Sequence, residues 1–200
     1  VITTNDSLVG VRDPQGFRPL CLGKTEHGYV LSSESCAFDA IKAEFIRDID
    51  PGEMVIIDDR GVRSTIYAEP QKIDKKLCVF EYIYFARSDS KIDGQSVYET
   101  RLNMGRELYN ETKYDADIVM SIPDSGTTAA LGYARASGIP FAEGLIKNRY
   151  SGRTFIKPNQ EERELAVRMK LNAMPEVVGG KRIVLIDDSI VRGTTSGLIV

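Results

Sequence analysis

The sequence predicts an α/β protein in which a β-rich part is followed by a part that alternates helices with strands. Up to about residue 67, short β-like runs lie between turn residues, which predicts an antiparallel sheet segment. Further on, the alternation of helical and strand patterns predicts a parallel sheet with helices on its faces. The polar stretch 69–76 separates the two patterns, so we expect residues 1–70 and 71–200 to belong to different domains.

The expected elements follow from these patterns. In the first part, the strands are the runs VITTNDSLVGV, FRPLCLG, GYVLSS and EMVIIDDRGVRSTIYA, and one helix is expected from Cys36 to about Phe45 with Ser35 or Ser33 as its cap. In the second part we expect helices over 95–113, 127–137 (ended by Gly138) and 160–171, and strands over 117–122, 141–146 and 183–186. Ligands bind such sheets at the carboxyl ends of the strands, where we therefore look for function.

Composition excludes several classes of protein. The net charge of −3 argues against a general nucleic-acid binder, whose phosphate contacts need a basic excess. No apolar run approaches the roughly 20 residues of a membrane span, and no signal-peptide pattern opens the chain, so we expect a cytoplasmic protein without a membrane partner. Three widely spaced cysteines are typical of reduced thiols, and the single histidine, His27, is expected in a turn.

The strand end with the strongest chemical signal is IVLIDDSIVRGTTS, residues 183–196. Four apolar residues predict a strand buried on both faces, and Asp187 and Asp188 stand where it ends. A turn with Gly193 follows, and then the hydroxyl residues Thr194, Thr195 and Ser196, which suit a helix start that binds an anion. A plain helix cap needs one acid and requires neither the glycine turn nor the hydroxyl cluster. We therefore predict a phosphate-binding site with a pair of ligand-binding carboxylates beside it.

A second strand end is SIPDSGTT, residues 121–128, where the loop Asp124, Ser125 and Gly126 leads into a helix that Thr127 opens. Its amides and hydroxyls could face a pyrophosphate. An ordinary strand-to-helix turn capped by Asp124 or Ser125 explains the local sequence equally well, so both interpretations stay open.

The third strand end is KNRYSGRTF, residues 147–155, followed by Lys157. Its cations alternate with Tyr150 and Phe155, and Gly152 supplies a hinge. A solvated charge run is the simple alternative. The position directly after a strand favours a basic lid over an anionic substrate.

These residues resemble the phosphoribosyl pyrophosphate motif of type I phosphoribosyltransferases. The stretches CVFEYIYFARSDS, KNRYSGRTFI, GVRDPQGFRPL and SSESCAFDAI are similar, more specifically, to the glutamine phosphoribosylpyrophosphate amidotransferase family, and the similarity covers essentially the whole chain. The resemblance implies that residues 1–70 are the C-terminal part of an αββα N-terminal-nucleophile glutaminase domain. It implies that residues 71–200 are a type I phosphoribosyltransferase domain that lacks its end.

The resemblance implies an amidophosphoribosyltransferase, a glycosyltransferase of the first committed step of purine synthesis. Such an enzyme forms 5-phosphoribosylamine, pyrophosphate and glutamate from phosphoribosyl pyrophosphate and glutamine. Ammonia attacks the anomeric carbon as pyrophosphate leaves, without a protein nucleophile, so positioning, charge neutralisation and water exclusion supply the rate. Magnesium is the implied cofactor, and we expect the full-length protein to form a homo-oligomer.

The resemblance also assigns residues to these roles. Asp187 and Asp188 would hold the ribose hydroxyls and magnesium, with Ser125 near the metal, because Mg²⁺ prefers oxygen ligands. The phosphate loop comprises Ser189, Arg192, Gly193, Thr194, Thr195 and Ser196. Asp124, Ser125, Gly126 and Thr127 would face the pyrophosphate. The closing loop would contribute Lys147, Arg149, Tyr150 and Arg153.

The chain departs from the family pattern in its cysteines. The glutaminase nucleophile is a cysteine at the mature N-terminus, whereas this chain begins at Val1, so we expect a fragment without that nucleophile. Cys21 and Cys36 are expected to be small buried side chains. Cys78 matches the first ligand of a [4Fe-4S] cluster that some members hold. Because cluster-free members can carry cysteine there too, one cysteine leaves both alternatives open.

Two other functions fit the motif less well. A salvage phosphoribosyltransferase acting on a free base would leave the first 67 residues unexplained. A non-catalytic regulator that binds phosphoribosyl pyrophosphate would need a DNA-binding element, and the sequence contains no basic recognition helix.

Overall fold

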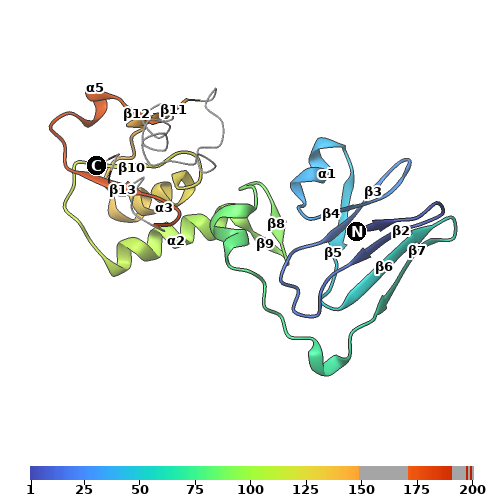
Figure 1. Cartoon of the computed structure of the whole chain (residues 1–200). Helices are drawn as coiled ribbons and strands as arrows, with labels where there is room; N and C mark the ends of the chain where they lie inside the picture. The colour runs from blue at the N-terminus through green and yellow to red at the C-terminus, as the bar shows by residue number, and fades with distance from the viewer. Residues whose placement is uncertain (149–170, 191–196, 198, 200) are drawn as a thin grey trace, which may run out of the picture. The chain divides into compact units, whose positions relative to one another are not determined.

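The computed structural model describes residues 1–148, 171–190, 197 and 199. The chain divides into two compact units, Val1–Thr100 and Arg101–Val200 (Figure 1). Within the described ranges, no helix is both long and apolar enough to cross a membrane.

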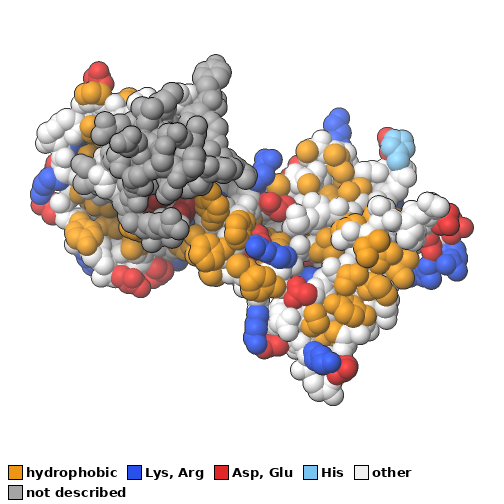
Figure 2. All heavy atoms as spheres, in the orientation of Figure 1, with side chains coloured by type: hydrophobic (Ala, Val, Ile, Leu, Met, Phe, Trp, Pro, Cys, Tyr) orange, Lys and Arg blue, Asp and Glu red, His pale blue; other side chains and the backbone are white. Residues whose placement is uncertain are grey.

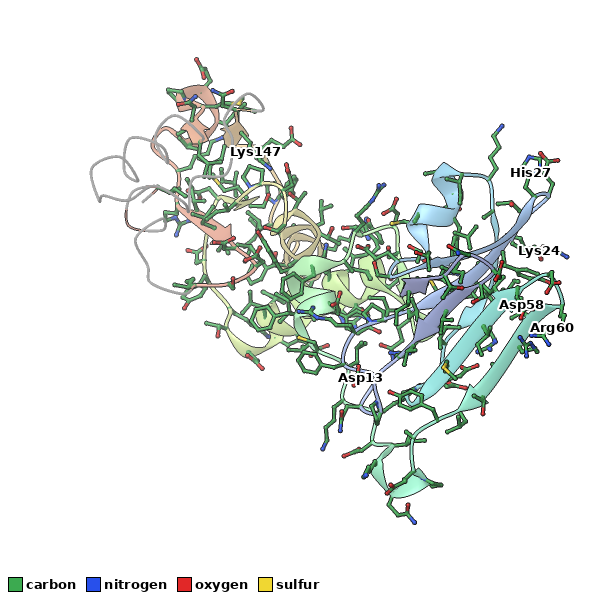
Figure 3. The ribbon with its side chains drawn as sticks, turned by 45° about the vertical axis from the view of Figure 1, so that its right-hand side comes forward. Asp13, Lys24, His27, Asp58, Arg60 and Lys147 are labelled. Carbon is green, nitrogen blue, oxygen red and sulfur yellow. The ribbon has the colours of Figure 1, made fainter. Side chains whose placement is uncertain are left out.

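Two antiparallel sheets form most of the first unit, as the sequence predicts. One has the strand order β1-β2-β6-β7 and the other β4-β3-β5. Their strands are β1 (Ile2–Thr3), β2 (Leu8–Val11), β3 (Cys21–Thr25), β4 (Gly28–Ser32), β5 (Glu44–Asp48), β6 (Glu53–Asp58) and β7 (Gly61–Ile66). The predicted turn position of His27 is confirmed, because it lies exposed at the tip of the β3–β4 hairpin, as Figure 3 shows.

A hydrophobic cluster connects the strands of the two sheets. Its buried members are Leu20, Leu22, Ile49 and Val55, and half-buried side chains such as Leu31 pack against them. Val55 is fully buried, and Glu53 and Ile57, two positions away on either side, point to the same face of β6. Successive side chains of β6 therefore point alternately to the core and to the opposite face of the sheet.

The predicted helix over 36–45 is too long. The helix α1 covers only Cys36–Ala40, and Phe45 lies in β5, where it pairs with Gly23 of β3. The chain leaves the helix at Lys42, whose φ of 55° is left-handed. Ser35 occupies the N-cap position without a capping bond, because its hydroxyl accepts the N–H of Lys91 at 2.8 Å instead.

The segment after residue 70 is bound to the first unit by backbone hydrogen bonds. The N–H groups of Asp74, Lys76 and Cys78 donate to the carbonyls of Pro14, Gln15 and Phe17, at 3.2, 2.7 and 3.1 Å. A 3₁₀ turn (Pro70–Lys72), a π-helical turn (Glu81–Phe85) and the hairpin of β8 (Lys91–Ile92) and β9 (Gln95–Ser96) follow. The polar stretch thus lies within the first unit, and the domain assignment at residue 70 stays a prediction.

Exposed aromatic side chains lie in the π-helical turn and directly before it. They include Phe80, Tyr84 and Phe85, each about half exposed. Arg18 forms an ion pair with Glu81 and lies over the Phe85 ring, 4.5 Å from its centroid. Figure 2 shows further hydrophobic side chains at the surface over the strands of the first unit.

A buried arginine fixes the loops of the first unit. Arg12, only 2% exposed, makes five hydrogen bonds, as many as its N–H groups allow: two to the carboxylate of Asp93 at 2.8 and 3.0 Å, and the others to the carbonyls of Gly16, Arg18 and Ile49. Burial alone would raise the pKa of Asp93, but the hydrogen bonds and charge of Arg12 outweigh it and hold that pKa below its usual range.

The second unit alternates helices and strands, as predicted. Its described elements are α2 (Val97–Glu111, which begins in the first unit), β10 (Ile118–Ser121), α3 (Thr127–Ser137), β11 (Leu145–Lys147), β12 (Leu171–Ala173), α5 (Pro175–Val178) and β13 (Ile183–Ile186). The strands β10 and β13 pair in parallel, and α3 ends at Gly138 with a left-handed φ of 74°.

Two expectations for the second unit need correction. Of the predicted strand over 141–146, Phe141 forms one parallel bridge to Val119, and residues 145 and 146 lie in β11, which pairs antiparallel with β12. The helix predicted over 160–171 lies outside the described residues, except that Leu171 begins β12. The strand 183–186, predicted to be buried on both faces, is β13, in which only Ile186 is buried and Ile183 is exposed. The strand whose residues are all buried is its neighbour β10.

Glycines let α2 and α3 touch through their backbones. A Cβ atom at Gly132 would lie 2.1 Å from the carbonyl oxygen of Leu102, and one at Gly105 would lie 1.8 Å from that of Ala129. No side chain fits at these distances, so both positions require glycine for the observed packing. The loop that follows β10 thus ends at α3, a helix that is closely packed against α2.

The first prediction concerns the buried ion pair. Asp93→Asn is expected to lower the free energy of unfolding by about 3 kcal/mol at pH 7, because the buried charge of Arg12 loses the carboxylate to which it makes two hydrogen bonds. The exposed pair of Asp89 with Arg87 supplies the control, since Asp89→Asn should cost less than about 1 kcal/mol. Because the folded pKa of Asp93 is lowered, its contribution is present above the unfolded pKa and is lost as the pH falls through the folded pKa. Urea unfolding at several pH values measures both effects, and a difference independent of pH would contradict the assignment.

The second prediction concerns the helix contact. Gly132→Ala should gain about 1 kcal/mol of helix propensity but lose more through displacement of α2, for a net destabilisation of about 2 kcal/mol. Thermal or urea unfolding measures the change, with Arg135→Ala on the exposed side of α3 as the control. A more stable Gly132→Ala protein would show that the helices do not pack this closely.

Candidate functional site

The carboxyl ends of β10 and β13 lie side by side. In the parallel register Ser121 is opposite Ile186, and the N–H of Ile122 donates to the carbonyl of Ile186 at 2.9 Å. The two loops that follow therefore leave the sheet at the same edge. These loops contain the acidic pair 187–188 and the loop 123–126, two of the three predicted strand-end motifs.

Gly126 brings the first loop into contact with the second. A Cβ atom there would lie 2.6 Å from the carbonyl oxygen of Ile186 and 3.2 Å from the Cα of Asp187. The peptide bond between Pro123 and Asp124 is cis. Gly126 also occupies the N-cap position of α3, so neither Asp124 nor Ser125, the two caps considered from sequence, holds that position. Ser125 lies in the same loop, between Asp124 and Gly126, and is half-buried.

The two adjacent acids differ in their surroundings. Burial raises the pKa of Asp187; the N–H of Asp188, which donates to the Asp187 carboxylate at 2.9 Å, opposes this rise, and the charge of Asp188 adds to it. The hydroxyl of Ser189 donates to the Asp188 carboxylate at 2.8 Å. The edge of the sheet thus holds a half-buried carboxylate whose charged form is disfavoured by burial.

Lys147 reaches the same loop from a different strand. It is the last residue of β11, and its ammonium group forms an ion pair with the carboxylate of Asp124. Figure 3 marks its position in the second unit. The third predicted motif is thereby connected to the first loop through its first residue. The other predicted residues of that motif, Arg149, Tyr150 and Arg153, lie outside the described residues, as do Arg192, Gly193, Thr194, Thr195 and Ser196 of the phosphate loop.

One residue of the site was not identified from sequence. Ser121, the last residue of β10, is buried, and its hydroxyl is 3.1 Å from the hydroxyl of Thr127 at the start of α3. This hydrogen bond spans the loop 122–126 and joins its two ends. The available signal was a serine directly after three apolar strand residues, where a buried hydroxyl needs a partner.

The cysteines and acids form no recognisable metal centre within the part of the chain that the structure describes. No group of three or more His, Cys, Asp or Glu side chains is arranged there to hold an ion. All three cysteines are free thiols, and the predicted burial of Cys21 and Cys36 is confirmed. Burial raises the pKa of Cys21 to about 12, and it also raises the pKa of Cys36. Cys78 is half-buried.

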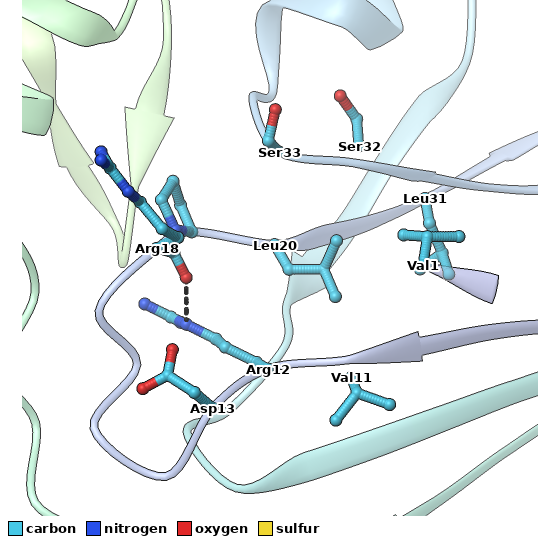
Figure 4. A pocket seen from close by; sticks show the side chains of 10 residues that line it. Val1, Val11, Arg12, Asp13, Arg18, Leu20, Leu31, Ser32 and Ser33 are labelled. Atoms are coloured by element: carbon cyan, nitrogen blue, oxygen red, sulfur yellow. Dashed lines mark hydrogen bonds between the residues drawn. The ribbon is translucent and has the colours of Figure 1, made fainter.

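Two cavities lie away from this edge. One, of about 380 Å³, lies in the first unit and is lined by residues that include Leu20 and Leu31; Figure 4 shows the guanidinium of Arg12 bonded to the carbonyl of Arg18 at this cavity. The other, of about 310 Å³, is lined by Tyr114, Arg182 and the start of β13, at the opposite end of the strand pair. We place the site by the chemistry of the strand ends, since neither cavity includes the acidic pair.

The chain was compared with known proteins. It is 56% identical over 196 residues to the amidophosphoribosyltransferase of Archaeoglobus fulgidus, which covers 98% of this chain and 42% of that protein. It is 51% identical over 200 residues to the amidophosphoribosyltransferase of Bacillus subtilis, covering all of this chain and 42% of the relative. No family model matches the sequence.

The chain also matches solved structures. The glutamine phosphoribosylpyrophosphate amidotransferase of B. subtilis, in complex with ADP and GMP, matches with a TM-score of 0.88 at 51% identity, over 97% of this chain and 42% of that one. A structure described as the allosteric regulatory enzyme of purine biosynthesis matches with a TM-score of 0.89 at 51% identity, over 98% of this chain and 42% of that one. The chain thus spans less than half the length of the relatives it matches, and over that span its sequence and its α/β fold with parallel strands are similar to those of amidophosphoribosyltransferases.

Proposed function

We propose that the full-length protein is an amidophosphoribosyltransferase that forms 5-phosphoribosylamine, pyrophosphate and glutamate from phosphoribosyl pyrophosphate and glutamine. The observation that carries this proposal is the contact between the loop 123–126 and the acidic pair at the parallel strand ends, in a chain at least half identical to curated amidophosphoribosyltransferases. A phosphorylated sugar needs polar protein groups that bind its ring and both of its phosphate ends. These two loops supply, at one edge of the sheet, the groups that bind the ring and the pyrophosphate.

The described residues take distinct roles in this proposal. Asp187 and Asp188 bind the ribose hydroxyls, and the loop from Asp124 to Thr127 faces the pyrophosphate. Ser189 begins the loop for the 5-phosphate. Lys147 neutralises phosphate charge as the bond between the anomeric carbon and pyrophosphate breaks and ammonia forms the new C–N bond.

The donor set at this edge fits magnesium. Carboxylate and hydroxyl oxygens are its preferred ligands, and it usually binds through one or two carboxylates together with the substrate's phosphates. Asp187, Asp188 and Ser125 would hold it, and a cation there would offset the burial that raises the pKa of Asp187. Bound magnesium would neutralise charge on the leaving pyrophosphate.

Residues 1–70 are proposed to be the C-terminal part of the glutaminase domain, and residues 71–200 to belong to the phosphoribosyltransferase domain. Cys21 and Cys36 do not suit the thiol nucleophile, because both are buried and their raised pKa values leave little thiolate at neutral pH. This agrees with a nucleophile at the mature N-terminus of the full-length protein. An iron-sulfur cluster would need three more thiolates besides Cys78. A cytoplasmic location and a homo-oligomer stay predictions.

The third prediction tests the acidic pair in catalysis. Asp187→Asn in the full-length protein should lower magnesium-dependent formation of phosphoribosylamine by about 100-fold or more, because a charged ligand at the ribose and metal is lost. Glutamine- and ammonia-dependent activities should fall together, and circular dichroism should show an unchanged fold. Asp59→Asn, at an exposed position of the β6–β7 hairpin, is the control. Wild-type activity in Asp187→Asn would refute the assigned role.

The fourth prediction concerns the stability of the ligand-free protein. Because the folded pKa of Asp187 is raised, its charged form destabilises the fold, and stability falls as the pH rises through that pKa. Asp187→Asn removes this cost, so the variant should unfold at a higher temperature than the wild type at pH 7 without magnesium. The difference should disappear at a pH below the unfolded pKa. Scanning calorimetry at a series of pH values measures it, and a less stable variant at pH 7 would contradict the prediction.

A further inference from the structure

The ion pair between Lys147 and Asp124 joins two residues that lie 23 positions apart in the chain. The Lys147 side chain is 33% exposed and that of Asp124 is 79% exposed. Ion pairs so open to solvent contribute little to stability, because water screens the charges and two long side chains lose freedom. A bound ligand of higher charge can therefore displace either partner without disturbing the fold.

Among the residues that the structure describes, the charges around this pair are mainly negative. The described loops after β10 and β13, with the last residue of β11, carry the carboxylates of Asp124, Asp187 and Asp188 and the single ammonium of Lys147. Gly126 contacts the backbone of Asp187, so these groups belong to one edge. The ammonium of Lys147 is paired with the carboxylate of Asp124.

A free diphosphate that enters this edge must separate Lys147 from Asp124 and remain near the released carboxylate. Like charges at such short range repel, even where water screens them. A diphosphate that carries a divalent cation avoids this repulsion, because the cation attracts the carboxylate of Asp124. The ion pair therefore penalises the free anion more than its metal complex.

From this arrangement, and on the basis of the proposed function, we propose that Asp124 is a specificity-determining residue. It acts as an internal counterion of Lys147 and makes the site select a metal-complexed diphosphate over the free anion. Asp124 holds the ammonium of Lys147 at the strand end, and the ammonium is released to the ligand at lower cost when a cation compensates the carboxylate.

The test measures binding of inorganic pyrophosphate to the full-length protein by isothermal titration calorimetry, with magnesium chloride or with EDTA. The wild type should bind much more tightly with magnesium. Asp124→Asn keeps the shape and a hydrogen-bonding group but removes the charge, so it should bind metal-free pyrophosphate about tenfold more tightly than the wild type. Its affinity with magnesium should change less, and the ratio of the two affinities should fall. Asp124→Glu retains the charge and should keep the wild-type ratio.

Asp115→Asn is the matched control. Asp115 is also an exposed aspartate in an ion pair, 2.5 Å from Arg182, but it lies at the opposite end of the β10–β13 pair. This variant should leave both affinities unchanged. Thermal unfolding of each variant confirms that the fold is retained, as expected for exposed positions.

The outcomes separate the inference from the proposed function. If the wild type binds pyrophosphate with magnesium and Asp124→Asn shows the same metal dependence, Asp124 is not the selecting residue although the site stands. Equal weakening of both affinities in Asp124→Asn also overturns the inference, because the carboxylate then only supports binding. If the wild type binds no pyrophosphate even with magnesium, the pyrophosphate site itself is refuted.

Discussion

The parallel pairing of β10 with β13 is the constraint on which the candidate site depends. It places Ser121 opposite Ile186, so the loops after both strands begin at the same level of the sheet. Gly126 converts this alignment into contact, because any side chain there would meet the carbonyl of Ile186 and force the loops apart. The acidic pair, the loop before α3 and the ion pair to Lys147 all take their positions from this contact. Among the described residues, the site is thus formed by the ends of strands.

Apolar packing on both sides of β10 makes that edge rigid. Val119 belongs to a cluster with Ala130, Tyr133 and Ile186, and Met120 belongs to another with Ile118 and Leu145. Because alternate side chains enter different clusters, the strand is held from two directions. The polar edge costs stability against this background, since burial disfavours the charge of Asp187. Such local costs are typical of functional sites, where binding a cation or substrate relieves them.

The first unit shows how charge can organise loops that have little regular structure. The guanidinium of Arg12 joins three backbone carbonyls and Asp93, so one side chain fixes positions from residue 16 to residue 93. Glu34 acts similarly, because its carboxylate accepts bonds from the N–H of Arg87 and the hydroxyl of Ser90, both at 2.8 Å. These bonds explain why residues 74–96 belong to the first compact unit although their composition differs from that of the preceding strands.

The sequence by itself determined the elements whose signals are local and strong. The strand 183–186, the helix 127–137 with its glycine end, the turn at His27 and the burial of Cys21 were predicted from period, capping and residue type. Tertiary structure alone decided the features that join distant segments. It made Phe45 part of a strand beside β3, reduced the strand expected before Lys147, and brought Ser121 to Thr127 and Lys147 to Asp124. The physical reason is that pairing and ion contacts depend on which surfaces meet after folding, and a short window of sequence contains only one of the two partners.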